Sequence, residues 1–381
     1  MMQADTVVNK GLEGVIVAES SVGFVDGQAG RLVYRGYNIE TLAEHSNYEE
    51  VAYLLLYGQL PNATELENFR ARLRNTVDLN PEVVGLIKSI APEAHPMSVL
   101  RTVVSFIGAQ DRKSSSTDLR DQEEMSLKLM SKLPAIVGTI ARASRHQDAV
   151  KPDPELSYAA NFLYCSTGKR PDKEEVKIMD TCLILHADHG SNASTFSALV
   201  TISTLADMYS AVTSAISTLK GPLHGGANEL ALETIKKVGK PENAEPVLSE
   251  MLAKKEKIMG FGHRVYKVYD PRARILKKFA ESVTKRNGKE GLFRTAEQME
   301  KVMISKLGEK GIFPNVDFYS GMVYDSLGFD SQMFTPIFAL ARIAGWTARS
   351  LEYIRDNKLF RPKAKYIGET GPKEYIGIQK R

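Results

Sequence analysis

Helix start and stop signals recur along the chain from about residue 40 onward, and they leave little room for strands. The segment YEEVAYLLLYG shows the pattern. Ser46-x-x-Glu49 forms a capping-box motif at its start, while Gly58 and then Pro61 should end the helix. Similar segments follow one another through most of the chain, so the sequence predicts a mainly α fold.

Before residue 40 the pattern is different. Short apolar runs at 22–25 and 32–34 flank a turn with Asp26-Gly27 and Gly30, which predicts a short N-terminal β-hairpin. The 381 residues, 43% of them hydrophobic, can supply a core for two or three domains. A net charge of +4 is too small to hold a polyanion by itself, so a nucleic-acid partner is not expected.

Neither the cysteines nor the N-terminus indicates an oxidising or membrane environment. Cys165 and Cys182 lie in apolar, helix-like segments, so no disulfide and no cysteine metal site is expected. The N-terminal stretch MMQADTVVNKGLEG carries Asp5 early and lacks the basic and apolar regions of a secretion signal. No later window holds eighteen uncharged apolar residues. We therefore expect a cytoplasmic protein without a membrane anchor.

Helix boundaries in the middle of the chain place polar residues at helix ends. Pro171 and the acidic residues after it should start a helix that runs to about Asp188, which puts His189 at its end with Gly190 behind it. Other expected elements are apolar helices at 194–206 and 209–220 and surface loops at 111–124 and 286–294.

The loop GPLHGGANE (221–229) places His224 between a Gly-Pro and a Gly-Gly pair, just before a new helix. Glycines let the backbone approach a small molecule closely, at a cost in conformational entropy. The positive end of the following helix disfavours a charged imidazolium. We therefore expect a neutral His224 that donates a hydrogen bond to a carbonyl group, with a purely structural loop as the alternative.

The segment MGFGHRVYKVYDPRAR (259–274) combines His263 with a run of cations and a glycine-rich start. A solvated basic face is one interpretation. The alternative is a site in which the backbone of 260–262 contacts a flat ring while cations such as Lys267 meet phosphates. Asp270-Pro271 should begin a helix with Arg272 in its first turn.

Three charged residues stand where a charge needs an explanation. Asp317 follows Pro314 in PNVDFYSG, where it could cap a helix, or where apolar neighbours could keep its carboxylate poorly hydrated and basic. Arg342 is a lone cation in an apolar helical run and needs an anion. Arg361 could be exposed or could bind a carboxylate with its planar fork. A base, neutral histidines, arginines and a basic loop together fit proton abstraction next to a carbonyl group.

In combination, GPLHGGANE, MGFGHRVYKVYDPRA and PNVDFYSG resemble the citrate synthase family, and the resemblance spans nearly the whole chain. It implies an all-helical homodimer whose subunits have a large and a small helical domain with the active site in the cleft between them. The large domain would comprise residues 1–224 and 329–381, and the small domain residues 225–328. The two domains would close on oxaloacetate.

The resemblance also implies a role for each candidate residue. Asp317 would remove a proton from the methyl group of the co-substrate acetyl-CoA, without a metal or permanently bound cofactor, while His224 donates a hydrogen bond to the thioester carbonyl. His263 would polarise and protonate the oxaloacetate ketone, and hydrolysis of citryl-CoA would release citrate and CoA. The implied oxaloacetate ligands are His189, Arg272, Arg342 and, reaching across from the partner subunit, Arg361. The implied CoA contacts are Asn192, Gly260, Phe261, Gly262 and Lys267.

Two positions depart from the family pattern. Relatives usually carry a larger apolar residue at the position of Ser191, and often a histidine at that of Arg349. Either difference could alter the packing beside the oxaloacetate site. The chain also begins close to the hairpin, so we expect neither an additional N-terminal domain nor the NADH inhibition that accompanies it.

Three other functions remain open from the sequence. A 2-methylcitrate synthase shares the fold and mechanism but prefers propionyl-CoA, and one methyl group in an apolar pocket changes binding by only about 1–3 kcal/mol. A metal-dependent hydrolase could use His186, His189, His224 or His263 as ligands, although no HExxH spacing is present. A helical scaffold or nucleic-acid binder would need a basic stripe interleaved with aromatic residues, which the sequence lacks.

Overall fold

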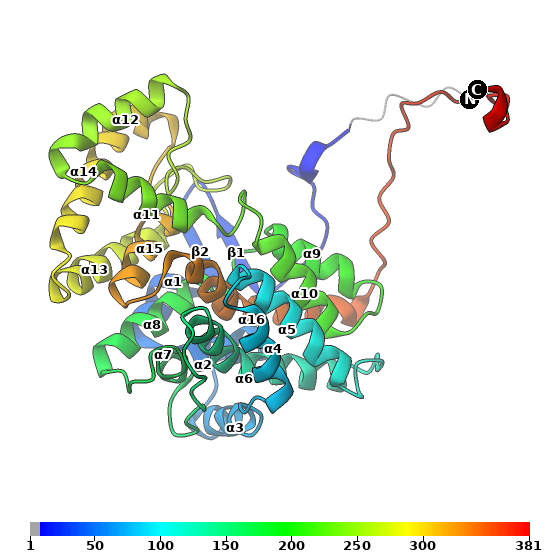
Figure 1. The fold of residues 1–381 in the computed structure, drawn as a ribbon, viewed down its shortest axis with the longest axis horizontal. Helices are drawn as coiled ribbons and strands as arrows, with labels where there is room; N and C mark the ends of the chain where they lie inside the picture. The colour runs from blue at the N-terminus through cyan, green and yellow to red at the C-terminus, as the bar shows by residue number, and fades with distance from the viewer. Residues whose placement is uncertain (1–7) are drawn as a thin grey trace.

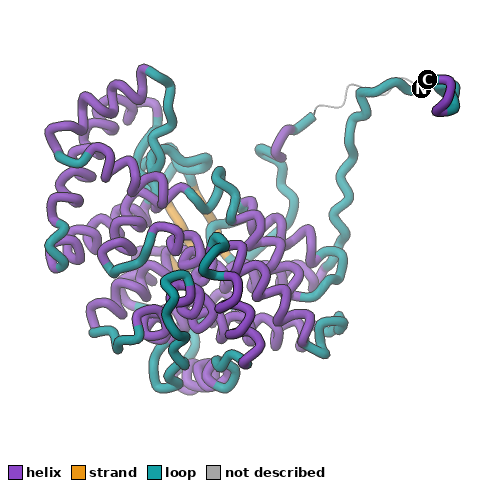
Figure 2. Tube along the Cα trace, viewed as in Figure 1, coloured by secondary structure: helices purple, strands orange, loops and turns teal. Residues whose placement is uncertain are grey.

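The computed structural model describes residues 8–381, so Asp5 and the start of the N-terminal stretch lie outside the described residues. Residues 8–381 form sixteen α-helices and one three-stranded sheet, which confirms the predicted mainly α fold (Figures 1 and 2). None of the helices in this range is both long enough and apolar enough to cross a membrane.

The elements follow one another in chain order. The first ten helices are α1 (Ile39–His45), α2 (Tyr48–Tyr57), α3 (Ala63–Arg74), α4 (Pro81–Ile90), α5 (Pro96–Gln110), α6 (Leu119–Ala143), α7 (Tyr158–Thr167), α8 (Lys173–His186), α9 (Ala193–Ile202) and α10 (Met208–Leu219). The remaining six are α11 (Ala227–Val238), α12 (Ala244–Ala253), α13 (Pro271–Arg286), α14 (Glu290–Leu307), α15 (Val316–Ser326) and α16 (Phe334–Tyr353). In Figure 1, α11 to α15 lie together on one side of the molecule, and the other helices surround α16.

The predicted hairpin is confirmed, with one strand more than expected. Strand β1 (Gly23–Asp26) pairs antiparallel with β2 (Arg31–Tyr34), so that Val25 faces Leu32. The short strand β3 (Tyr37–Asn38) adds to the free edge of β2. In the view of Figure 1 the hairpin lies between the α11–α15 group and the helices around α16.

Helix α16 is the centre of the core. Every side chain from Phe334 to Leu351 is buried, and α16 contacts α2, α6, α8, α9 and α10. A helix that is apolar on almost all sides is stable only in the interior, which is where its neighbours hold it. This burial places Arg342 and Arg349, two charged residues of α16, inside the protein.

Several predicted helix boundaries are wrong by a few residues. The cap of α2 is Asn47, whose side chain accepts the N–H of Glu50, rather than Ser46 with Glu49. Both residues are good caps, but Ser46 already ends α1 and its hydroxyl donates to the Glu50 carboxylate. The helix expected to reach Asp188 ends at His186, and the helix expected to reach residue 206 ends at Ile202. The expected loops at 111–124 and 286–294 are partly helical, since α6 and α14 begin inside them.

The tip of the hairpin packs directly on the loop that follows His263. The carbonyl oxygen of Gly27 accepts the N–H of Lys267 at 3.0 Å. A Cβ atom on Gly27 would lie 2.1 Å from the carbonyl oxygen of Val265, so no side chain fits at this position. The glycine that was predicted as a turn residue is therefore also required by a close tertiary contact.

Candidate active site

Most of the predicted site residues line one large cavity. Its volume is about 1130 Å³, and it is bordered by the hairpin, the loops after α8 and α10, the His263 loop, α15 and α16. The predicted residues in its lining are His189, His224, His263, Asp317, Arg272, Arg342, Asn192 and Gly262. Gly260, Phe261, Lys267 and Arg361 are not part of the lining.

Asp317 lies in the first turn of α15 and is not its cap. The cap is Asn315, whose Oδ1 accepts the N–H of Asp317 at 3.0 Å, so the capping interpretation of Asp317 is wrong. No residue in 8–381 forms a hydrogen bond or ion pair with the Asp317 carboxylate. Burial raises the pKa of Asp317 to about 7, against the opposing effect of the Arg272 charge. An unpaired carboxylate with this pKa is suited to remove a proton near neutral pH.

A second aspartate, Asp270, contacts both Arg272 and the residue before Asp317. Asp270 caps α13 and accepts Nε and Nη2 of Arg272 at 3.0 and 2.8 Å. The same carboxylate accepts the N–H of Val316, the residue before Asp317, at 3.2 Å. Both Asp270 and Arg272 are buried. The position of Asp317 is therefore tied to that of the Arg272 guanidinium.

The local backbone fixes the proton of His263. Its Nδ1 accepts the N–H groups of Val265 and Tyr266 at 3.0 and 3.1 Å. Burial, helped by the Arg272 charge, lowers the pKa of His263 to about 4, so the ring is neutral at pH 7. We assign the single ring proton to Nε2, because Nδ1 is used as an acceptor. His263 is thus a neutral hydrogen-bond donor in the cavity wall.

His224 is held by the start of α9. The backbone N–H of Ser194 donates to Nε2 of His224 at 3.3 Å, and the Ser194 hydroxyl lies 2.9 Å from the same nitrogen. Burial and then the charge of Arg342 lower the pKa of His224 to about 4. With Nε2 as acceptor, we assign the proton of the neutral ring to Nδ1. The ring is therefore neutral, and its donation to a carbonyl group stays a prediction.

His189 follows α8 and lies near His263. The two rings have centroids 5.2 Å apart, and Nε2 of His189 is 3.2 Å from the hydroxyl of Tyr266. Burial and the nearby Arg272 charge lower the pKa of His189 well below its ordinary value. The cavity therefore contains three neutral histidines and the unpaired carboxylate of Asp317.

Arg342 and Arg361 differ in burial and in their hydrogen-bond partners. Arg342 is buried and donates Nε to the carbonyl oxygen of His186 at 2.6 Å, and no carboxylate of residues 8–381 forms an ion pair with it. Burial lowers its pKa to about 10. The anion that we expect Arg342 to need is therefore not supplied by residues 8–381. Arg361 is exposed and donates to the carbonyl oxygen of Pro362, away from the cavity of its own chain.

The residues predicted to contact CoA have structural contacts of their own. Asn192 caps α9 by accepting the N–H of Thr195. Phe261 pairs with Pro314 through an isolated antiparallel bridge, and its ring packs on Phe318 with centroids 4.5 Å apart. Lys267 is exposed. The CoA contacts remain a prediction.

His186 and the cysteines belong to the core. The Nδ1 atom of His186 lies 2.8 Å from the carbonyl oxygen of Cys182, and the ring is fully buried with a pKa lowered to about 3 by that burial. Cys165 and Cys182 are free and buried. The described part of the chain contains no group of three or more His, Cys, Asp or Glu residues arranged to hold a metal ion.

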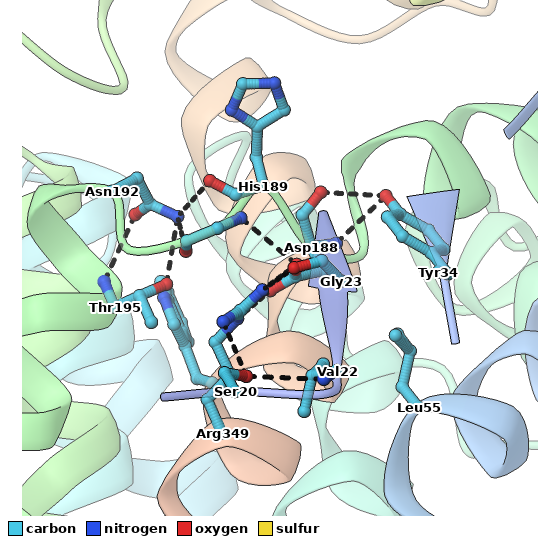
Figure 3. A network of polar contacts seen from close by, with 12 residues as sticks. Ser20, Val22, Gly23, Tyr34, Leu55, Asp188, His189, Asn192, Thr195 and Arg349 are labelled. Atoms are coloured by element: carbon cyan, nitrogen blue, oxygen red, sulfur yellow. Dashed lines mark hydrogen bonds and ion pairs between the residues drawn. The ribbon is translucent and has the colours of Figure 1, made fainter. Parts of the chain in front are cut away.

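The sequence interpretation missed four residues that support the site. Ser194 orients His224, Tyr266 contacts His189, Asp270 pairs with Arg272, and Asp188 pairs with Arg349 (Figure 3). Asp188 and Tyr266 lie one and three residues from predicted site histidines, which is the signal that could have found them. Asp270 was recognised only as a helix cap.

Known proteins match this chain over nearly its whole length. The family profile described as "Citrate synthase, C-terminal domain" matches residues 11–363. A citrate synthase of Deinococcus radiodurans is 45% identical over 98% of this chain and 99% of its own length. A 2-methylcitrate synthase of Corynebacterium glutamicum is 40% identical over 99% of this chain and 98% of its own length.

A solved structure provides a third comparison. It is a ternary complex of carboxymethyl coenzyme A and oxaloacetate with citrate synthase from Thermoplasma acidophilum. It is 35% identical to this chain, has a TM-score of 0.94, and the match covers 98% of this chain and 100% of that one. The fold, the cavity and the sequence matches together show that the chain belongs to the citrate synthase family.

Proposed function

We propose that this protein condenses acetyl-CoA with oxaloacetate and water to give citrate and free CoA. The observation that carries the proposal is an unpaired carboxylate, Asp317, that lines the same cavity as the neutral donors His224 and His263. The related citrate synthases support the choice of substrates.

The first step is enolisation of the thioester. Asp317 removes one proton from the methyl group of acetyl-CoA, and the electron pair of that C–H bond forms the carbon–carbon double bond of an enolate. His224, through Nδ1–H, donates to the thioester oxygen where negative charge develops. A thioester α-carbon is a weak acid, so a base and a preorganised donor are both needed.

Carbon–carbon bond formation and hydrolysis follow. The α-carbon of the enolate attacks the ketone carbon of oxaloacetate, and the ketone oxygen takes up the proton that His263 donates from Nε2. Arg272, Arg342 and His189 hold the carboxylates and carbonyl of oxaloacetate. Water then attacks the thioester carbon of citryl-CoA and gives one proton back to His263, the C–S bond breaks, and the sulfur leaves as the CoA thiol with the proton that Asp317 took from the methyl group. Closure of domain 225–328 on the rest of the chain keeps water out until the new carbon bond exists.

We also propose a cytoplasmic homodimer in which Arg361 reaches the active site of the partner subunit. The segment after α16 leaves the body of the molecule in an extended form (Figure 1), and Tyr366 and Ile367 in it are 71% and 92% exposed. Such an apolar extension is typical of a segment that docks on another copy. The free, buried Cys165 and Cys182 fit a reducing compartment.

Subunit mixing tests the shared site. Arg361→Ala and Asp317→Asn homodimers should each be nearly inactive. Mixed dimers should regain one working site, made of Asp317 from one subunit and Arg361 from the other. Equimolar co-expression then gives about one quarter of wild-type activity, since about half of the dimers are mixed. Mixtures that stay as inactive as the separate variants would show that Arg361 acts in its own subunit, and an active Arg361→Ala homodimer would show that it has no role.

The pH dependence should report Asp317. Because the pKa of Asp317 is raised to about 7 and the base must be ionised, kcat/KM should rise with pH and level off above about pH 7. Below that value it should fall by about tenfold per pH unit. His224 and His263 have pKa values near 4 and do not titrate in this window. A rate profile with acetyl-dephospho-CoA, which lacks the titrating 3′-phosphate, should show the same inflection; a flat profile from pH 5 to 8 would contradict the assignment.

Thiol release with oxaloacetate tests the function itself. Acetyl-CoA and propionyl-CoA should be compared by kcat/KM, with Asp317→Ala as the control. Faster turnover of acetyl-CoA, lost in the variant, supports the proposal. A preference for propionyl-CoA keeps the mechanism but makes the protein a 2-methylcitrate synthase, like the C. glutamicum relative. No thiol release from either substrate rejects both functions.

A further inference from the structure

Arg349 lies on the same face of α16 as Arg342, two turns later, and also lines the cavity. Its guanidinium group is nevertheless occupied by protein groups. Nε and Nη2 donate to the two oxygens of Asp188 at 2.7 and 2.8 Å. Nη1 donates to the hydroxyl of Ser20 at 2.9 Å, and Nη2 also donates to the carbonyl oxygen of Gly23 at 3.2 Å. Asp188 therefore pairs the charge of Arg349, whereas Arg342 has no ion-pair partner among residues 8–381.

The Asp188–Arg349 pair is buried. Asp188 is 0% exposed and Arg349 6% exposed. Burial alone would raise the pKa of Asp188, but the Arg349 charge holds it below its ordinary value. A bidentate, desolvated pair of this kind has a fixed geometry, because either partner alone would be an uncompensated charge in the interior.

This pair fixes the backbone on both sides of His189. Asp188 is the preceding residue, and its Oδ2 also accepts the N–H of Gly190 at 3.1 Å. The hydroxyl of Tyr34 donates to the carbonyl oxygen of Asp188 at 2.8 Å. The N–H of Gly345 donates to the carbonyl oxygen of Ala187 at 3.0 Å. Figure 3 shows the result: the His189 ring points away from the pair, while its backbone is part of the network.

The same arginine also anchors the base of the hairpin. Its bonds to Ser20 and Gly23 hold the start of β1, and Tyr34 at the end of β2 contacts Asp188. At the other end of the hairpin, Gly27 accepts the N–H of Lys267 in the loop that follows His263. One connected structure therefore runs from Arg349 to the loops that carry His189 and His263.

We propose that Arg349 is a positioning residue: through Asp188 and the β1–β2 hairpin it sets the place of His189 in the oxaloacetate site. The inference rests on the proposed function, because its test measures the KM for oxaloacetate. It also assigns a role to a position that departs from the family pattern. Arg349 does not bind the substrate itself, since Asp188 compensates its charge.

A double-mutant cycle of Arg349→Lys, Asp188→Asn and the combined variant tests the proposal. Arg349→Lys keeps the positive charge and loses the planar fork. A displacement of about 1 Å in a positioned group can cost about 100-fold in rate, so each single variant should raise the KM for oxaloacetate by at least about tenfold. The KM for acetyl-CoA should stay within about twofold. The combined variant should be no worse than the worse single variant, because both act through the same contact.

The control is Arg74→Lys, which alters an exposed ion pair with Glu67 on α3 and should behave as wild type. Three results would overturn the proposal. Additive effects of the two substitutions, or an unchanged KM in Asp188→Asn, would mean that Arg349 binds the substrate directly. A lower melting temperature with unchanged kinetics would mean that the pair only stabilises the fold. Thiol release by the wild-type enzyme in the same assay separates these results from a failure of the proposed function.

Discussion

Replacing Asp317 with asparagine is expected to lower kcat for thiol release by about 10²–10⁴-fold, the range typical of a lost general base. The amide has nearly the same shape and fits the first turn of α15, but it cannot take up a proton from the methyl group of acetyl-CoA. The KM values should change little, because the substrate contacts remain. The measurement is steady-state thiol release at saturating oxaloacetate and acetyl-CoA, compared with wild type.

One control variant and one stability measurement make this result specific. Glu281→Gln removes an exposed carboxylate on α13 and should keep wild-type activity. Asp317→Asn should also be more stable than wild type at pH 8. The pKa of Asp317 in the folded state is raised to about 7. The wild-type protein therefore loses stability as pH rises from the ordinary aspartate pKa to about 7, and the asparagine variant, which does not ionise, avoids this loss. A variant that keeps its activity, or one that loses it by unfolding, would contradict the assignment.

His224→Ala is expected to lower kcat by about 10²–10³-fold, as for other enzymes that lose a donor to a developing oxyanion. The neutral ring is held by Ser194, so its Nδ1–H is already aimed before the charge develops. Because the bond strengthens in the transition state, kcat should fall more than KM rises. Steady-state kinetics with acetyl-CoA measure both constants.

The Ser194→Ala variant keeps the His224 ring but removes a contact that orients it. It should lower kcat by about tenfold, because the imidazole remains but loses its hydroxyl contact. His45→Ala is the matched control, since His45 is a surface residue whose side chain is 70% exposed. If His224→Ala raised only the KM for acetyl-CoA, His224 would bind the ground state and would not stabilise the enolate.

Local sequence signals predicted the parts of the fold that depend on neighbouring residues. The hairpin follows from a glycine-containing turn between two short apolar runs, and Asp270-Pro271 marks the start of α13 correctly. A cap or a turn is determined by groups within about one helical turn of each other, so the chain specifies it wherever it occurs. The three motifs sufficed to predict the family, and the family profile and relatives confirm it.

Where two nearby residues can each cap a helix, only the structure shows which of them does so. Asn315 and Asp317 are both good caps and lie two residues apart, but only Asp317 was considered as a cap from the sequence. In the folded chain Asn315 takes the capping role, which leaves the Asp317 carboxylate free in the cavity. The same holds for Ser46 and Asn47 at the start of α2.

The electrostatics of the site were decided by tertiary structure alone. Asp188 and Arg349 are 161 residues apart in sequence, and only the packing of α16 against the loop after α8 brings them together. Burial sets the raised pKa of Asp317 and the lowered pKa values of His224 and His263, and burial is a property of all the chain segments around a residue. The sequence by itself therefore determined the elements, the family and the identity of the chemical groups. The tertiary structure decided which of those groups are paired, neutral or free to react, because desolvation and ion pairing depend on atoms distant in sequence.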